Sequence, residues 1–325
     1  MTRRHYARII LALVLLVGCL TVMPVGAMSY AIVKLPDNQY LASTYPDLEN
    51  YTYSYIQSIK PTYNISLIIN TGDIVDNPNR AYQWQNWKNA RTYTTIPELD
   101  VAGNHDLVDY YEGNGLPNYT NFSVNTAATL SGGAINWTYV YQNFVFLGIG
   151  WSNGATTSAC PNSTLDAADV TAFNTAQASN PTLIPWFLVH WYMEPGGSYS
   201  NAYLDQQIQQ TMILRPSLIS SGHVGNTDRT QNTIWNNTPV VESVYNQQLN
   251  GTPQGNYSGF QLWQVTVVGG VVTTINETTF QIYPTNVTWP TVTYYTGGGD
   301  STIFGILIEC HPKPDCCILW YISDE

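Results

Sequence analysis

From Tyr30 onward, short apolar runs alternate with longer polar segments that suit helices, and this alternation most constrains the fold. The first three apolar runs are YAIVKL, ISLIIN and ELDVAG, and the segments between them are YPDLENYTYSYIQSI and NRAYQWQNWKNA. Strands that alternate with helices form β-α-β units, in which helices cover a buried sheet. The sequence therefore predicts an α/β fold whose functional loops follow the carboxyl ends of its strands.

The middle of the chain predicts a second sheet. The runs INWTYVYQ and FVFLGIGW are typical of an antiparallel pair of strands. The runs LIPWFLVH and SLISSGH predict two more strands, which end at His190 and His223, and a helical segment precedes each of them. Further along, Gly269-Gly270 separates two strand-like runs and predicts a hairpin with a two-residue turn.

Residues 1–27 predict an export signal. They begin with the basic stretch MTRRHYAR, continue with an apolar run and end in the small residues of a cleavage site. Two alternatives stay open: a lipid anchor on Cys19, or an uncleaved N-terminal segment in the membrane. We expect a secreted or cell-surface protein that contacts a membrane only through such an anchor. Residues 28–285 would form the catalytic domain, and the tail 286–325 receives no assigned structure.

Charged residues make up only 10% of the chain, against roughly 25% in ordinary soluble domains. Residues 1–27 hold three of the 11 basic side chains and none of the 22 acidic ones, so the remainder has 8 basic residues and a formal charge near −14. This negative charge repels nucleic-acid backbones, and we therefore expect no nucleic-acid polymer as a partner. The sequence predicts no particular oligomeric state.

Two further patterns suit an exported protein. Cys160 would form a disulfide with one of Cys310, Cys316 and Cys317, a choice that the sequence leaves open. Asn-x-Ser/Thr motifs predict a glycoprotein, although abundant Asn and Thr also generate such motifs by chance. They lie at Asn50, Asn64, Asn118, Asn121, Asn136, Asn162, Asn236, Asn250, Asn256, Asn276 and Asn286.

Metal-binding side chains collect just after the predicted strands. Taken singly, each has an ordinary role as a helix cap, a turn residue or a core histidine. Together they supply carboxylates, amides and imidazoles without a thiolate, a ligand set that suits divalent Mn, Fe or Zn. In chain order they are Asp37 and Gln39, Asp73 and Asp76, Asn104, His105 and Asp106, then His190 and His223.

The order Asp, Gly-Asp, Gly-Asn-His-Asp, His and Gly-His resembles that of the calcineurin-like metallophosphoesterases, from about residue 31 to 229. The resemblance implies a four-layer α/β/β/α sandwich that carries two divalent metals. Asp73 would bridge both metals, Asn104, His190 and His223 would complete one site, and Asp37 would belong to the other.

The resemblance also implies the reaction, which is hydrolysis of a small phosphorylated substrate, either a phosphomonoester or a phosphodiester. Metal-bound hydroxide would attack phosphorus, and His105 would assist the leaving group with Asp106 as its partner. Asp76 matches no ligand of the family and would only orient its loop. Arg229 would either contact the phosphate or be a solvated surface residue, and we favour the second role.

Two positions depart from the family pattern. Gln39 replaces the usual histidine of Asp-x-His, and Gly225 replaces the second histidine of Gly-His-x-His. Both missing imidazoles belong to the same site, so we expect one strong metal site and one weak or empty one. Gln39 would be a weak ligand there, with Asn226 or Asp228 as substitutes. The alternative to an enzyme is a catalytically silent surface binding protein with a degenerate metal site.

Overall fold

The structure is a computed structural model. It describes residues 26–107, 119, 135–151, 165–192, 202–213, 215–223, 230–235, 238–243, 258–282, 287–288, 291–296, 303–310 and 317–320. Most of the expected signal segment, Cys160, and the loop 224–229 with Gly225, Asn226, Asp228 and Arg229 lie outside these residues. Their assignments therefore stay predictions.

The first sheet contains nine strands, and its parallel part contributes half of the site. β1 (Met28–Leu35) is parallel to β2 (Ile65–Asn70), and β2 is parallel to β3 (Glu98–Asp100). On the other side of β1, the antiparallel hairpin of β10 (Ser258–Val268) and β11 (Val271–Ile282) continues the sheet. The three strands expected from the amino-terminal apolar runs are therefore present, with β2 at the expected bounds.

The β10–β11 hairpin confirms the predicted two-residue turn. Gly269 and Gly270 have φ angles of 63° and 83°, and a type I′ turn requires positive φ at both central residues. Beyond it, strands extend the sheet through the tail that received no assigned structure. They are β12 (Val287–Thr288), β13 (Thr291–Thr296), β14 (Ile303–Cys310) and β15 (Cys317–Trp320). The register pairs the backbone of Cys310 with that of Cys317.

The second sheet has six strands in the order β4-β5-β6-β7-β9-β8. β4 and β5 are antiparallel, as expected, and β6, β7 and β9 continue from β5 in parallel. The sequence did not predict β8 or β9. The bounds are β4 Trp137–Tyr141, β5 Phe144–Ile149, β6 Ile184–Val189, β7 Leu218–Ser221, β8 Thr230–Trp235 and β9 Thr238–Ser243.

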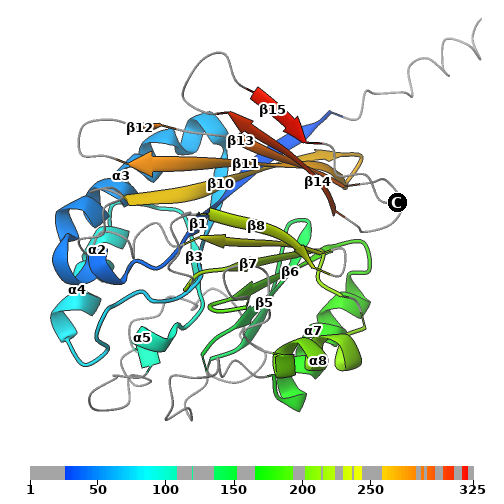
Figure 1. The fold of residues 1–325 in the computed structure, drawn as a ribbon, viewed down its shortest axis with the longest axis horizontal. Coiled ribbons are helices and arrows are strands. Elements are labelled where there is room, and N and C mark those ends of the chain that lie inside the picture. Colours follow the sequence, from blue (N-terminus) through cyan, green and yellow to red (C-terminus); the bar gives the residue numbers. More distant parts are fainter. Residues whose placement is uncertain are drawn as a thin grey trace, which may run out of the picture.

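Helices cover the outer face of each sheet, and the molecule has the four layers of the predicted α/β/β/α sandwich (Figure 1). The first sheet carries α2 (Gln39–Thr44), α3 (Pro46–Tyr63) and α4 (Ala81–Arg91). The second sheet carries α7 (Ala167–Ser179) and α8 (Ala202–Thr211). In the sequence, α2, α4, α7 and α8 each follow a strand and α3 follows α2, which agrees with the predicted alternation of strands and helices.

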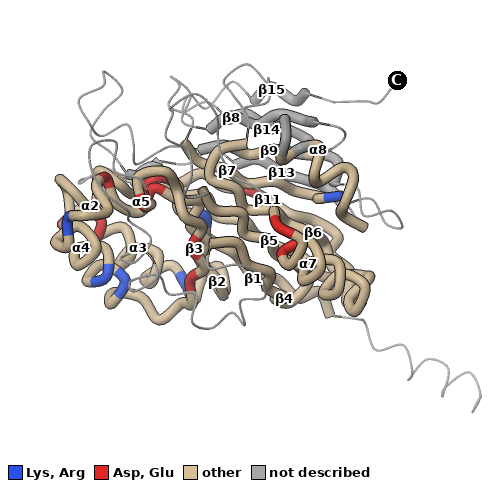
Figure 2. Tube along the Cα trace, turned by 90° about the horizontal axis from the view of Figure 1, so that it is seen from below, with Lys and Arg blue, Asp and Glu red and all other residues tan. Residues whose placement is uncertain are grey.

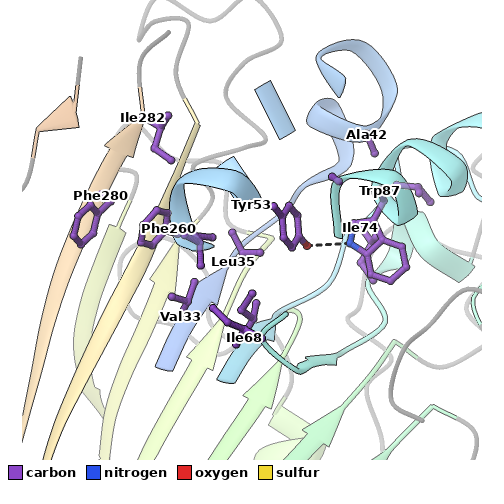
Figure 3. Close-up of a cluster of buried hydrophobic side chains, with 14 of the residues drawn as sticks. Val33, Leu35, Ala42, Tyr53, Ile68, Ile74, Trp87, Phe260, Phe280 and Ile282 are labelled. Carbon is purple, nitrogen blue, oxygen red and sulfur yellow. Dashed lines mark hydrogen bonds between the residues drawn. The ribbon is translucent and has the colours of Figure 1, made fainter. Parts of the chain in front are cut away.

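Apolar side chains fill the space between every two layers. Between the sheets, the rings of Trp186 and Trp263 have centroids 5.1 Å apart. Under α3 and α4, Phe260 of β10 lies close to the helices, and Trp87 Nε1 donates a hydrogen bond of 3.2 Å to Tyr53 (Figure 3). Burial of each such side chain contributes about 1.5–3 kcal/mol, so the two halves of the site rest on a well-packed core.

The two sheets are also joined by a buried lysine. Lys34 of β1 is fully buried, and its Nζ donates hydrogen bonds of 2.7 Å to the carbonyl of Ser221 and 2.9 Å to that of Val241. These carbonyls belong to β7 and β9 of the other sheet. Lys34 lies three residues before Asp37, and Ser221 lies two before His223, so this contact sets the spacing of the loops that follow.

Charged residues are sparse along the described chain, and Lys and Arg occur on α3 and α4 (Figure 2). Within the described residues, no helix is both long and apolar enough to span a bilayer. Among the glycosylation motifs, Asn64 is exposed, whereas Asn136 is buried and its Nδ2 donates a 2.7 Å hydrogen bond to Asp169. We therefore expect no glycan on Asn136 in the folded protein.

Candidate metal centre

Three of the predicted ligands have unusual backbone conformations. The φ angles are 41° for Asp37, 52° for Asp73 and 66° for His223, after β1, β2 and β7 respectively. Positive φ costs a residue with a side chain about 1–2 kcal/mol, and such strain is concentrated at functional sites. The backbone therefore changes direction at each of these residues, just after the strand ends.

Two glycines make room for the ligands. A Cβ on Gly72, whose φ is 101°, would lie 2.5 Å from Nδ1 of His190. A Cβ on Gly103 would overlap the carboxylate and the backbone nitrogen of Asp73. The glycines of the Gly-Asp and Gly-Asn-His-Asp motifs are therefore required because the loops pass each other at contact distance.

His190 lies at the centre of the site and is fully buried. Its Nδ1 is 2.8 Å from the carbonyl oxygen of Thr71, which can only accept, so Nδ1 carries a hydrogen. Its Nε2 is 2.9 Å from Oδ1 of Asn104 and 3.2 Å from Oδ1 of Asp73. Burial lowers the pKa of His190, but the negative charge and hydrogen bond of Asp73, together with smaller effects of Asp37 and Thr71, raise the pKa to about 9. The proton on Nε2 thus occupies the position that a cation would take.

His223 approaches the same point from the other sheet. Its Nδ1 is 3.1 Å from Nε2 of His190. Burial, followed by the positive charge of His190, lowers the pKa of His223 to about 3, so its imidazole is neutral. Neutral imidazole is the form that binds metals. Ligand atoms of Asp73, His190 and His223 all lie within 4.8 Å of one another, as the ligands of one ion require.

Asp73 carries the negative charge of this cluster. Its Oδ1 accepts a 3.0 Å hydrogen bond from the backbone N–H of His105. Burial alone raises its pKa, but the charge of His190, with smaller effects of His105 and His223, lowers the pKa below the ordinary value. Its Oδ2 has no hydrogen-bond partner within the described residues.

A buried carboxylate oxygen without a partner is costly, and a divalent cation would satisfy it. With Asn104, the donor set comprises two nitrogens and two oxygens, which suits Mn, Fe or Zn. The residues that the sequence assigned to the strong site therefore come together and fit a metal.

The second predicted site is less complete. Both carboxylate oxygens of the buried Asp37 accept from the backbone N–H of His223, at 3.0 Å each. Burial, reinforced by the charge of Asp73 and opposed by His190, raises the pKa of Asp37 well above its usual range. Gln39 is buried at the start of α2, and neither atom of its amide has a partner in the described part of the chain.

His105 contacts Asp76, a residue that the sequence predicted only to orient its loop. Nδ1 of His105 lies 2.7 Å from the carbonyl oxygen of Asp76 and 3.7 Å from its Oδ1. The His105 side chain is 21% exposed, which is enough to reach a substrate. The only sequence sign of this contact was the position of Asp76, three residues after Asp73 in one loop.

Asp106 has a different environment from the expected one. Its Oδ1 accepts from the backbone N–H of Ile74 (2.8 Å) and Val75 (3.0 Å), and its Oδ2 accepts from Gly103 (2.8 Å). Burial, followed by the charge of Asp73, raises its pKa to about 7 against the effect of these donors. Asp106 thus ties the loops after β2 and β3 together. Trp151 and Trp191, which the sequence interpretation did not single out, also line the centre.

The structure is similar to that of purple acid phosphatase PPD1 from yellow lupin (Lupinus luteus) seeds, with a TM-score of 0.50 and 14% identity. That match covers 83% of this chain and 54% of the lupin chain. The calcineurin-like phosphoesterase YfkN of Bacillus subtilis gives a TM-score of 0.38 at 13% identity, over 82% of this chain and 91% of YfkN.

In sequence, the chain is 32% identical over 88 residues to the uncharacterized protein YvnB of Bacillus subtilis (strain 168), a match to 26% of this chain and 7% of YvnB. The chain thus spans a small part of that relative. Residues 35–226, more than half of the chain, match the calcineurin-like phosphoesterase family. This range includes Asp37, Gln39, Asp73, Asn104, His190 and His223. The chain belongs to the calcineurin-like phosphoesterase family.

Proposed function

We propose that this protein is an exported, metal-dependent phosphoesterase that hydrolyses a small phosphomonoester or phosphodiester. The observation that most supports the proposal is the double contact of Asp73. Its Oδ1 lies 3.2 Å from Nε2 of His190 and accepts from the backbone N–H of His105 at 3.0 Å. One carboxylate thereby fixes a metal ligand and the proposed proton donor relative to each other.

The strong site would be held by Asp73, Asn104, His190 and His223. A bound divalent cation supplies positive charge beside the phosphoryl oxygens and acidifies a water molecule. The weak site would be limited to Asp37, Asp73 and Gln39. The carboxylate of Asp37 already accepts from His223, and an amide replaces the imidazole at Gln39, so we expect one tightly bound ion per chain.

Proton transfer falls to His105. The carbonyl of Asp76 accepts from Nδ1–H, so the imidazole exchanges its proton with the substrate at Nε2. In the forward direction this nitrogen donates to the leaving oxygen, a step that typically contributes about 10²–10⁴-fold in rate. Asp106 contributes indirectly, because it holds the backbone of the two loops that carry Asp73 and His105.

Metal analysis and assays on the purified full-length chain test this function. The substrates are a chromogenic phosphomonoester and a chromogenic phosphodiester, each with Mn, Fe or Zn supplied. We expect one equivalent of metal and turnover of at least one substrate. His190→Ala and Asn104→Ala should lose both, whereas Asn89→Ala, an exposed amide on α4, should keep both. Equal turnover by wild type and His190→Ala would contradict the proposal.

The second candidate is a catalytically silent binding protein of the cell surface. The buried Gln39, with both amide atoms unpartnered within the described residues, favours this alternative, since the family's two-metal centre is reduced here. Stoichiometric metal without turnover on either substrate, under any of the three metals, would support it. Detection of the protein in the cell-surface fraction of a culture would support export, whether the protein is an enzyme or a binding protein.

A further inference from the structure

An aromatic face covers the His223 imidazole. The ring of Trp191 lies 4.0 Å from that of His223, centroid to centroid, with 30° between the planes. Trp191 directly follows His190, so one dipeptide supplies both a ligand and the ring that contacts another ligand. The indole and the imidazole are close enough to exclude water from that side of His223.

A second tryptophan supports the first. Trp151 lies 5.9 Å from Trp191 with only 6° between the ring planes. It also stands edge-on to His190 at 6.4 Å and lies 6.2 Å from His223. Its own position is fixed, because its backbone N–H donates a 2.8 Å hydrogen bond to Ala102 after β3, and its side chain is only 6% exposed. Trp151 thus anchors the aromatic pair to both sheets.

The backbone contact of His223 does not fix its side chain. The carboxylate of Asp37 fixes its backbone N–H, but that contact leaves the side-chain torsions undetermined. Its backbone is in the left-handed region, with φ at 66°, so the main chain stores strain that favours rearrangement. The contact between Nδ1 and His190 would be replaced when both nitrogens bind one cation.

We propose that Trp191, supported by Trp151, is a positioning residue that holds the His223 imidazole with Nδ1 directed at the metal centre. An imidazole that coordinates a cation carries part of its positive charge, and the negative face of an indole attracts it. Trp191 therefore stabilises the metal-bound orientation more than the metal-free one. The inference requires the metal centre of the proposed function but not turnover.

Metal titration of the full-length chain, freed of metal with a chelator, tests this role. Calorimetry with Zn²⁺ gives the affinity, and the visible absorption of the Co²⁺ form reports the ligand geometry. We expect Trp191→Leu to weaken Zn²⁺ binding about 10–100-fold, as loss of a residue that orients a ligand typically does, and to shift the Co²⁺ spectrum. Trp191→Phe keeps an aromatic face and should remain within about threefold of wild type.

The matched control is Tyr139→Leu, which removes another half-buried, stacked ring from β4, far along the chain from the ligands. It should lower the melting temperature without changing metal binding. The proposal would be overturned if Trp191→Leu had the Zn²⁺ affinity and Co²⁺ spectrum of wild type. It would also be overturned if Trp191→Phe weakened Zn²⁺ binding as much as Trp191→Leu does. If Trp191→Leu does not fold, Trp151→Leu decides, because it keeps Trp191 and removes the ring that supports it. Weaker Zn²⁺ binding by Trp151→Leu would uphold the proposal, and unchanged binding would overturn it.

These outcomes are separable from those of the proposed function. A wild-type chain that binds Zn²⁺ but hydrolyses neither chromogenic substrate contradicts the proposed activity, while the Trp191 comparison still stands. A wild-type chain that binds no metal overturns both.

Discussion

Nδ1 of His105 lies 2.7 Å from the carbonyl oxygen of Asp76, so the proposed proton donor is held by a residue of the preceding loop. Asp106, which follows His105 in the sequence, instead accepts hydrogen bonds from the backbone of Ile74, Val75 and Gly103. The two acidic residues therefore have separable functions, one at the reacting side chain and one in the loop framework.

Substitution of Asp76 should affect turnover without affecting the fold. Asp76→Asn keeps the backbone carbonyl that binds His105 but removes the carboxylate charge 3.7 Å from Nδ1. We expect kcat to fall about tenfold, less than the 10²–10⁴-fold loss expected for His105→Ala. Metal affinity and melting temperature should equal those of wild type. A variant with unaltered kcat would show that only the carbonyl of Asp76 matters.

Substitution of Asp106 should first affect stability. Asp106→Asn turns one acceptor oxygen into a donor that faces backbone N–H groups in a fully buried position. An unsatisfied buried donor costs about 1–3 kcal/mol, so the urea midpoint should fall, and metal binding should weaken because the loops separate. If Asp106→Asn loses turnover but keeps the stability and metal affinity of wild type, Asp106 would instead be the direct partner of His105.

Gly103→Ala should abolish metal binding. The added Cβ would overlap the carboxylate of Asp73, and the backbone of a paired loop cannot move away without breaking the contact with Asp106. Gly270→Ala is the control, because open space surrounds its Cβ and only its φ of 83° is strained. It should cost about 1–2 kcal/mol and leave metal binding intact. Calorimetric titration with Zn²⁺ distinguishes the two variants.

The layered fold was predictable because buried strands and amphipathic helices leave different periods in the sequence. β2, with the sequence ISLIIN, is mostly apolar and matches its predicted bounds. β8 and β9 were missed because TQNTIW and TPVVES carry too few apolar residues at alternating positions to suggest paired strands. β8 and β9 form strands because they pair with neighbouring strands of the sheet, and their own composition does not indicate this.

The grouping of the candidate ligands was predictable because each follows a strand, and parallel strands bring their carboxyl ends together. The partner of His105 was not. His105 and Asp106 are successive residues of the short helix α5 (Asn104–Leu107), and adjacent residues on a helix do not face each other. The contact of Trp191 with His223 was not predictable either. A tryptophan at the end of a strand is typical of a core residue, and the sequence does not show which residue of another strand it contacts.

Restoring the missing imidazoles should create a second metal site. Gln39→His combined with Gly225→His returns the two histidines of the family pattern that this chain lacks. We expect the metal content to rise from one to two equivalents, with a second-site affinity at least about tenfold above that of wild type. Elemental analysis after dialysis against Zn²⁺ measures the content. Unchanged content would mean that the hydrogen bond from His223 to Asp37 keeps this carboxylate from the metal.

Glu49 of α3 should make the stability of the protein depend on pH. This α3 residue is fully buried, and neither carboxylate oxygen has a partner among the described residues. Burial, followed by the negative charge of Glu98, raises its pKa well above the usual range. Glu98 is itself paired with Arg91 at 2.8 Å and accepts a hydrogen bond of 3.0 Å from Tyr53.

The sign of the effect follows from proton binding. Below about pH 4, the usual pKa of a glutamate, Glu49 is protonated in both the folded and the unfolded chain and has no pH-dependent effect. As the pH rises, the unfolded chain ionises first, so the folded protein loses stability until Glu49 ionises in it as well. Glu49→Gln cannot ionise and should escape this loss.

We therefore expect Glu49→Gln to match wild type near pH 4 and to be more stable than wild type at pH 7, because its amide does not ionise. Urea unfolding between pH 4 and pH 8 measures the difference. Glu98→Gln should do the opposite and destabilise the protein at neutral pH, because it removes the carboxylate that pairs with Arg91. A constant difference between Glu49→Gln and wild type across this range would show that Glu49 has the same pKa in the folded and unfolded chains.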